Sequence, residues 1–288
     1  MDHPLLHLAA ALGTSYYFSF PIWQTLTLAF AATNLRSLPL ISYHARLLPS
    51  LFRLFVPAFQ PPPPTPPSKS APSIFHKESV TSSRCCALDC DINFHKSNST
   101  FLTDLDINRA ELLSQHFPAA LNKLSSRGDA DEKGKGKRVN LILGAVHTSF
   151  HREIKPYQRY EVKSRILAWD EKWIFVVSYF VKPGTVISKV AGEALLEVNR
   201  EATDLDAKKS DGARPGAGIF ATAVSRYVLK KGRVTVPPEM LMGEMGFLGY
   251  ENGRAAGEGW SKEKVEEVRQ AGAGFAEGWL GMDRLRMM

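Results

Sequence analysis

One helical segment followed by four strand-like segments constrains the fold of this chain more than any other feature. Apolar residues recur near helical spacing from Asn98 to Phe117, and residues able to cap a helix stand at its start. The strand-like segments that follow are 139–150, 157–169, 173–181 and 219–231. The segment 173–181 is almost continuously apolar, which is typical of a central strand. With a further candidate strand at 81–91, this order predicts an α+β domain built on one long helix.

The N-terminal region contains a long apolar segment. Residues 8–35 include no Asp, Glu, Lys or Arg, and such a length can cross a hydrocarbon core of about 30 Å. A cleaved signal peptide is the rival interpretation, but no Lys or Arg precedes the apolar segment and no small-x-small cleavage site ends it. The sequence therefore predicts an N-terminal hydrophobic helix that acts as a transmembrane anchor within residues 1–35.

A second apolar segment, 38–59, is interrupted by Arg46 and Arg53. It suits an amphipathic helix on a membrane and equally a helix packed on the domain, and both interpretations stay open. Arg36, Arg46 and Arg53 follow the anchor, so the positive-inside rule predicts a single-pass membrane protein with its domain in the cytosol.

The remaining boundaries follow from composition. Residues 60–72 (QPPPPTPPSKSAP) form a semi-extended spacer, so residues 36–80 are expected to be an amphipathic segment and a Pro-rich linker. We expect the folded domain at 81–235 and a C-terminal tail at 236–288 with a helix at 260–279.

Several function classes are disfavoured by composition. The chain of 288 residues carries 36 Lys and Arg against 29 Asp and Glu, which suits an anionic ligand or lipid surface. It has no basic stripe with interleaved aromatic residues, so no nucleic-acid partner is expected. Cys85, Cys86 and Cys90 with His95 match no common zinc spacing, and we expect neither a metal nor a cofactor. Nucleophile-elbow, phosphate-loop and HExxH motifs do not occur in the sequence.

A motif immediately before the long helix narrows the fold. The run DINFHKSNSTFL at 91–102 resembles the D-x-x-x-H-x-N-N-x-x-Y-L signature of hotdog proteins of the 4-hydroxybenzoyl-CoA thioesterase type. The segment ILAWDEKWIFVVSYFV resembles the central hairpin of the membrane-anchored branch that includes mammalian thioesterase superfamily member 6. Thioesterase-like proteins of fungal secondary-metabolite gene clusters carry a similar HKSNSTF run. Ser97 and Phe101 depart from the signature, which has Asn and Tyr at these places.

The resemblance implies a single hotdog domain, in which an antiparallel sheet wraps around the long helix, and a homodimer. It implies a thioesterase-like hydrolase that cleaves an acyl-CoA or a carrier-bound acyl chain, with a role in fungal secondary metabolism. Two alternatives remain: a catalytically silent hotdog protein that binds acyl chains at a membrane, and a hotdog dehydratase.

The resemblance also implies the site residues. Thioester hydrolysis needs a carboxylate to activate water or attack directly, and hydrogen-bond donors for the developing oxyanion. Asp91 is implied as the base, Asn98 as part of the helix end that faces the thioester, and His95 as a residue that orients the loop or binds substrate. Asp104 is the second candidate for a catalytic acid. Asp91 and Asn98 are alternatively only capping residues, and Asp89 is a further carboxylate that the sequence does not exclude without the motif.

Overall fold

The computed structural model describes residues 21–37, 42–60, 75, 77–127, 137–187, 218–245, 250–251, 254–255 and 262–280. The helices are α2 (Ile22–Asn34), α3 (His44–Phe55), α4 (Asn98–His116), α5 (Pro118–Ser126), α7 (Pro238–Glu244) and α8 (Lys262–Leu280). The strands of the main sheet are β1 (Glu78–Arg84), β2 (Val139–Phe150), β3 (Arg159–Trp169), β4 (Trp173–Val181), β5 (Ile219–Lys231) and β6 (Val234–Val236). The described residues also include three short 3-10 turns: η1 (Leu35–Ser37), η3 (Pro57–Phe59) and η4 (Ala87–Asp89). A separate hairpin consists of β7 (Tyr250–Glu251) and β8 (Arg254–Ala255).

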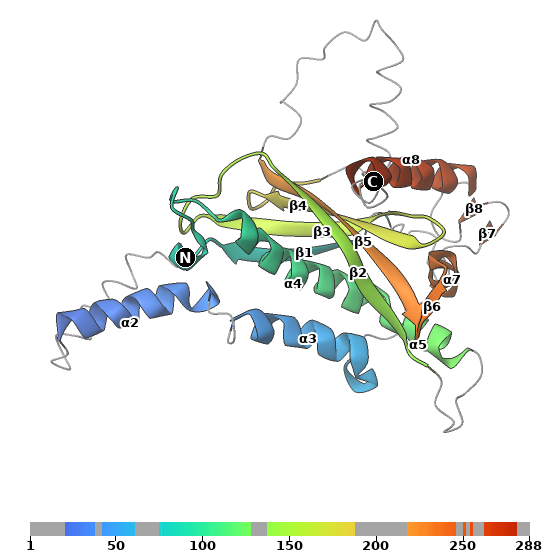
Figure 1. The fold of residues 1–288 in the computed structure, drawn as a ribbon, viewed down its shortest axis with the longest axis horizontal. Helices are drawn as coiled ribbons and strands as arrows, with labels where there is room; N and C mark the ends of the chain where they lie inside the picture. The colour runs from blue at the N-terminus through green and yellow to red at the C-terminus, as the bar shows by residue number, and fades with distance from the viewer. Residues whose placement is uncertain are drawn as a thin grey trace, which may run out of the picture.

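The main sheet is antiparallel and covers the long helix. Its strands lie in the order β1-β3-β4-β5-β2, and β6 pairs with the end of β5. Register shifts interrupt the pairing of β2 with β5 and of β3 with β4, and such bulges allow a sheet to bend. Figure 1 shows α4 lying along one face of this sheet, with α8 on the other face. The predicted helix at 98–117 and the four predicted strands are confirmed, and the arrangement is the hotdog fold.

Strand β4 explains why its sequence is almost continuously apolar. Ile174, Val176 and Phe180 belong to the clusters that pack against α4 and α5. Phe175 and Val177 alternate with them and pack with residues of α8 instead. Because successive side chains of a strand point to opposite faces, a strand covered on both faces needs apolar residues at nearly every position.

Helix α4 is buried on more than one side, which accounts for its buried polar residues. The sheet covers one side, and α3 lies along another (Figure 1). Asn108 is fully buried and donates from Nδ2 to the carbonyl oxygen of Val162 at 2.9 Å. Arg109 donates to Ser225 Oγ at 2.5 Å. These bonds fix the helix against the sheet because a buried polar group without a partner is costly.

Helix α8 approaches the sheet closely at Gly272. A Cβ atom at this position would lie 2.8 Å from the carbonyl oxygen of Leu167 and 3.0 Å from the Cβ of Ala168. The apolar neighbours Ala273 and Ala276 are buried in the same contact. Helix α8 of the predicted C-terminal tail therefore packs on the sheet, and α7 adds Leu241 and Met242 to the main core.

We expect Gly272→Ala to lower the free energy of unfolding by about 1–3 kcal/mol, because backbone atoms of β3 block the added methyl group. The matched control is Gly274→Ala on the same helix, where a Cβ atom meets nothing within 4 Å. That change should be neutral or slightly stabilising because alanine favours helix. Urea unfolding of both variants checks this prediction, and equal effects would contradict the close packing of α8.

Some expectations differ from the structure or fall outside it. Pro118 follows the C-cap of α4, where a proline is expected to end a helix, and it also begins α5, since proline is compatible with the first turn of a helix. The strand predicted at 81–91 is observed earlier, as β1, and η4 follows it. Residues 1–20 of the predicted anchor lie outside the described residues, as does the segment 192–201, for which the sequence predicts a short helix. None of the described helices has the length and apolar character needed to cross a bilayer.

Candidate active site

The loop before α4 is a tight turn that exposes a carboxylate. The Asp91 N–H donates to the carbonyl oxygen of His95 at 3.0 Å, and the Phe94 N–H donates to the carbonyl oxygen of Asp91 at 3.1 Å. Phe94 has a φ of 57°, a conformation that is rare for a bulky residue. The Asn93 N–H donates to Asp91 Oδ1 at 2.9 Å. The loop therefore holds the Asp91 side chain in one orientation at the cost of local backbone strain.

Asp91 and His95 form a partly exposed pair. Asp91 Oδ1 lies 3.6 Å from His95 Nδ1, and the two side chains are 30% and 28% exposed. Within the described parts of the chain, Oδ1 makes both contacts of this carboxylate and Oδ2 has no protein partner. Asp91 thus has an oxygen available to a water molecule or to an acyl carbon.

Asp89, the alternative carboxylate, already has partners within the protein. Its Oδ2 accepts the N–H of Cys86 at 3.2 Å and lies 3.9 Å from Lys96 Nζ. Its carbonyl oxygen accepts the N–H of Ser97 at 2.8 Å and the hydroxyl of Thr100 at 3.1 Å. These bonds attach η4 to the start of α4, and they favour Asp91 over Asp89 as the reactive acid.

The N-terminus of α4 has the character of an oxyanion site. Ser97 is the N-cap residue, and its side chain makes no capping bond to the helix. The first turn carries no acidic residue. Backbone N–H groups at a helix N-terminus lack partners within the helix and carry partial positive charge. An acyl oxygen that becomes negative in a reaction would be stabilised there.

A cavity of about 260 Å³ lies at this helix end. Asn98 and Phe101 of α4, His95 and Lys96 of the loop, and the residues at the end of β2 line it. The Lys96 N–H donates to the carbonyl oxygen of Ile154 at 2.8 Å, which joins the loop to the segment after β2. The structure thus brings His95 and Asn98 to one cavity, with Asp91 paired to His95.

The segment after β2 was not predicted as part of the site. Phe150, His151, Arg152 and Glu153 line the cavity. His151 Nε2 lies 3.1 Å from Thr222 Oγ1 on β5, and the ring of Phe150 packs edge to face on Phe101 at 5.1 Å. The cluster of charged and imidazole groups in HREIK, directly after an apolar strand, is the signal in the sequence that could have indicated these residues.

Asp104 lies in a different environment from the other candidates. Its carboxylate is buried, accepts from the Tyr160 hydroxyl, and lies 2.8 Å from Arg46 Nη2 and 3.1 Å from Lys96 Nζ. Burial alone would raise the pKa of Asp104, but the positive charges of Lys96 and Arg46 and the Tyr160 bond outweigh it and lower that pKa. An acid held in its charged form by two cations fits a structural anchor better than a proton donor. Its catalytic role stays a prediction.

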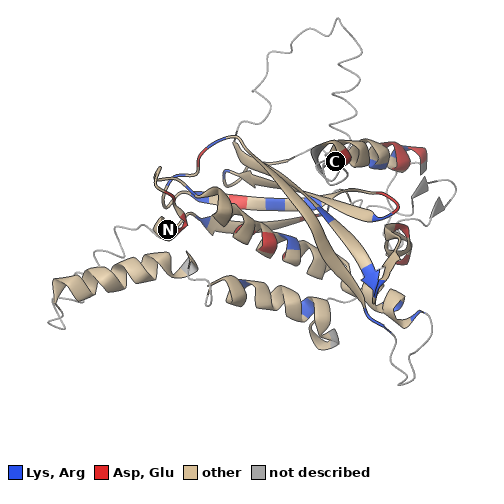
Figure 2. Cartoon of the chain, in the orientation of Figure 1, with Lys and Arg blue, Asp and Glu red and all other residues tan. Residues whose placement is uncertain are grey.

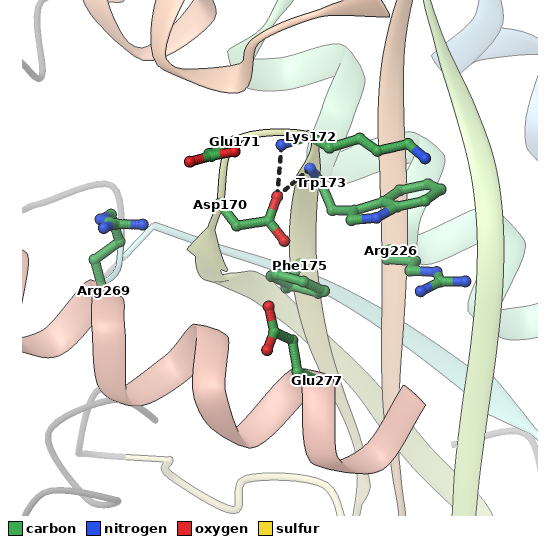
Figure 3. Close-up of a pocket in the computed structure, with 8 residues that line it drawn as sticks. All are labelled: Asp170, Glu171, Lys172, Trp173, Phe175, Arg226, Arg269 and Glu277. Carbon is green, nitrogen blue, oxygen red and sulfur yellow. Dashed lines mark hydrogen bonds between the residues drawn. The ribbon is translucent and has the colours of Figure 1, made fainter. Parts of the chain in front are cut away.

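Two other cavities are larger. One, of about 400 Å³, lies between α3 and α4 and includes Arg46 and Asp104. The other, of about 500 Å³, lies where the turn between β3 and β4 meets α8 (Figure 3). Its residue Asp170 accepts the N–H groups of Lys172 and Trp173 at 2.6 and 2.5 Å, so this carboxylate holds the turn (Figure 3).

The chemistry of the turn cavity is less suited to thioester hydrolysis. The Trp173 ring lies 4.7 Å from Lys172 Nζ and 4.4 Å from Arg226 Cζ. Helix α8 contributes Arg269 and Glu277, which stand in its middle and near its C-terminus. Neither position supplies the free N–H groups of a helix N-terminus. The cavity at α4 is smaller, but it is lined by the first residue of that helix and by His95, which pairs with Asp91.

The three cysteines form a cluster that is mostly buried, and two of their thiols are in contact. Cys85 Sγ and Cys90 Sγ are 3.5 Å apart, and all three cysteines are free thiols. Burial raises the pKa of the Cys85 thiol above its ordinary range. Among the described residues, no group of His, Cys, Asp and Glu side chains is arranged to hold a metal ion.

The fold and the helix end define a class of protein: hotdog domains in which a helix N-terminus faces a small cavity, here with a histidine that pairs with a carboxylate. A family model described as the thioesterase-like superfamily matches residues 85–241, and the chain belongs to this superfamily.

Curated fungal relatives extend the similarity beyond the domain. The chain is 38% identical over 275 residues to the probable thioesterase atnL of Emericella nidulans, covering 90% of this chain and 85% of that protein. It is 40% identical over 213 residues to the thioesterase poxG of Penicillium oxalicum, covering 72% of this chain and 67% of that protein. The thioesterase lcsJ of Purpureocillium lilacinum is 30% identical over 256 residues, covering 77% and 74%.

Proposed function

We propose that this protein hydrolyses acyl thioesters at the N-terminus of α4, with Asp91 as the acid that activates water or attacks the acyl carbon. The observation that carries this proposal is the N-terminus of α4, which lacks a side-chain cap and shares a cavity with His95, the partner of the Asp91 carboxylate. The family membership and the three relatives named thioesterases support the reaction class.

The residues at the N-terminus of α4 and around its cavity have separate roles in this reaction. The N–H groups of the first turn, at Asn98 and Ser99, stabilise the oxyanion that forms when the carbonyl is attacked. His95 holds Asp91 Oδ1 in place, because its ring lies next to that oxygen. Phe101 and Phe150 cover the apolar side of the cavity, and His151, Arg152 and Glu153 line its polar side. The Arg152 guanidinium suits a phosphate-bearing carrier of the acyl group.

The substrate is an acyl-CoA or a carrier-bound acyl chain, and the proposal includes a role in fungal secondary metabolism. The similarity to proteins of filamentous fungi supports this role. The reaction is tested by measuring the release of free thiol from a panel of acyl-CoA and acyl-carrier substrates. No thiol release on any of them would favour a silent acyl-binding protein, and turnover of 3-hydroxyacyl thioesters to enoyl products would favour a dehydratase.

The proposal includes a homodimer formed through β2. This strand is at the end of the sheet order and spans 12 residues. Ile142, Leu143 and Phe150 expose 41–49% of their area along it. A long edge strand with exposed apolar residues is a ready surface for pairing with another strand. Since Phe150 also lines the cavity, a second copy on β2 would lie next to the active site.

We expect Ile142→Lys to convert the protein to a monomer and to lower thioester hydrolysis, because a lysine on an edge strand opposes pairing. The matched control is Val234→Lys on β6, where the valine is 68% exposed. Light scattering measures the mass of both variants. A wild-type monomer, or a dimer that survives Ile142→Lys, would contradict pairing through β2.

A membrane location is the last part of the proposal. The uncharged segment 8–35 and the apolar residues on α2 and α3 support it. The cytosolic side has less support than the sequence indicated, because Arg46 and Arg53 pair with Asp104 and Glu111 of the domain. Arg36 remains the flanking charge that favours this side.

A further inference from the structure

Helix α3 turns its polar side toward the domain. Arg46 lies 2.8 Å from Asp104, Ser50 Oγ donates to Glu111 Oε2 at 2.7 Å, and Arg53 pairs with the same glutamate. Positions 46, 50 and 53 are spaced by four and three residues, so they form one stripe on the helix. All three side chains of the stripe form ion pairs or hydrogen bonds with α4.

The opposite side of α3 and most of α2 are apolar and exposed. In α2 the side chains buried by the rest of the protein are Thr25 and Asn34, and Asn34 Oδ1 accepts the N–H of Leu88 at 3.0 Å. We call the outward side chains of these helices and of the short turns η1 and η3 the N-terminal apolar surface. Its members are each 41–64% exposed: Ile22, Trp23, Leu26, Leu28, Phe30, Leu35, Leu48, Phe52, Phe55 and Phe59.

This polarity is the reverse of that in a soluble amphipathic helix, which buries its apolar stripe and exposes its polar one. Because α2 and α3 both bury polar side chains and expose apolar ones, together they form an exposed apolar surface. Exposed apolar surfaces of this kind mark interaction sites. Figure 1 shows α3 along the side of α4 that faces away from the sheet, and α2 continuing beyond the N-terminal end of α3.

The charges around the surface identify the partner. Between Asp2 and Glu78 the sequence contains no Asp or Glu, and Figure 2 shows no acidic residue on α2 or α3. At the C-terminal end of α3, the Arg138 guanidinium lies 5.0 Å from the Phe55 ring and donates to the Phe55 carbonyl oxygen at 2.7 Å. Lys137 beside it is exposed. An apolar face with basic residues at one end and no carboxylate on its own helices is complementary to a bilayer with anionic lipids.

The lengths of the helices set how they would meet the bilayer. With 13 and 12 residues, α2 and α3 each extend about 20 Å, which is too short for a hydrocarbon core of about 30 Å. Trp23, the most exposed member of the surface, is of a residue type that collects at membrane interfaces.

We propose that the N-terminal apolar surface docks into the interface of an anionic bilayer, with α2 and α3 lying in the membrane plane and the ion pairs of α3 holding the domain to them. The proposal specifies the surface and the lipid class for the membrane location proposed above. Because α3 is attached to α4, docking places the hydrolase domain directly against the lipid.

Vesicle sedimentation with the full-length protein tests this proposal. The variant Leu48→Asn/Phe52→Asn removes two exposed members of the surface, and it should weaken binding to vesicles of phosphatidylcholine with phosphatidylserine about tenfold or more. The matched control is Val186→Asn/Val234→Asn, which removes two exposed apolar side chains elsewhere and should bind like the wild type. Unchanged binding by Leu48→Asn/Phe52→Asn would overturn the proposal.

Two further measurements distinguish a lipid partner from a protein partner. Lys137→Gln/Arg138→Gln should lose the preference for phosphatidylserine over pure phosphatidylcholine, and equal binding of wild type to both vesicles would contradict the anionic lipid. If the surface instead pairs two copies of the chain, Leu48→Asn/Phe52→Asn would halve the mass in solution without lipid. Thiol release from a soluble acyl-CoA should be unaffected by these variants, so a failure of docking and a failure of the hydrolase assignment are distinguishable.

Discussion

Replacing Asp91 with asparagine should lower kcat/KM for thioester hydrolysis by about a hundredfold to ten-thousandfold, the usual contribution of a positioned acid or base. Asparagine keeps the side-chain oxygen that accepts the Asn93 N–H at 2.9 Å, so the loop should keep its shape. It cannot take a proton from water or form an acyl intermediate. The loss should therefore appear in kcat/KM with little change in the thermal midpoint.

The matched control for this variant is Asp170→Asn. Asp170 likewise accepts backbone N–H groups in a turn, but it lines the larger cavity at α8. Hydrolysis by Asp170→Asn should equal that of the wild type. If Asp170→Asn loses activity while Asp91→Asn keeps it, the active site lies in the turn cavity and the assignment to α4 is wrong.

Asp104→Ala should lower the free energy of unfolding by about 3–5 kcal/mol, because it leaves the buried Lys96 ammonium without its closest carboxylate. The double variant Asp104→Leu/Lys96→Met should recover much of this loss, since both buried charges are removed together. The control Glu277→Ala changes an exposed carboxylate and should alter stability by less than about 0.5 kcal/mol. Urea unfolding checks all three, and a mild effect of Asp104→Ala would contradict the anchor role.

The same carboxylate predicts an acid dependence of stability. The folded protein lowers the pKa of Asp104 below its unfolded value of about 3.9. Its contribution is therefore fully present above about pH 4 and is lost as the pH falls through the lower folded pKa. Asp104→Asn should reduce the slope of stability against pH in this acid range.

Local patterns in the sequence were sufficient for the framework of the fold. The helix at 98–117 and the strands at 139–150, 173–181 and 219–231 follow from apolar spacing, and the structure places α4, β2, β4 and β5 there. The apolar run of β4 also indicated its central position. Pro118 was interpreted only as a stop, although proline fits the first turn of a helix equally well.

The parts that the sequence did not predict depend on contacts between distant residues. The segment after β2 joins the site through the bond from Lys96 to Ile154, which no local pattern encodes. The pairing of Asp104 with Arg46 spans 58 positions, so its spacing on α4 could not reveal an anchor. The same amphipathic pattern in α3 fits a membrane or a domain, and only the positions of Asp104 and Glu111 show which side faces inward.

A crystal structure with a non-hydrolysable acyl-CoA, in which a methylene group replaces the thioester sulfur, tests the central claim most directly. We predict that the carbonyl oxygen lies about 2.7–3.1 Å from the N–H groups of Asn98 or Ser99, with the Asp91 carboxylate facing the carbonyl carbon. A carbonyl bound in the cavity of Asp170, Trp173 and Arg226, or one turned away from the end of α4, would contradict the account.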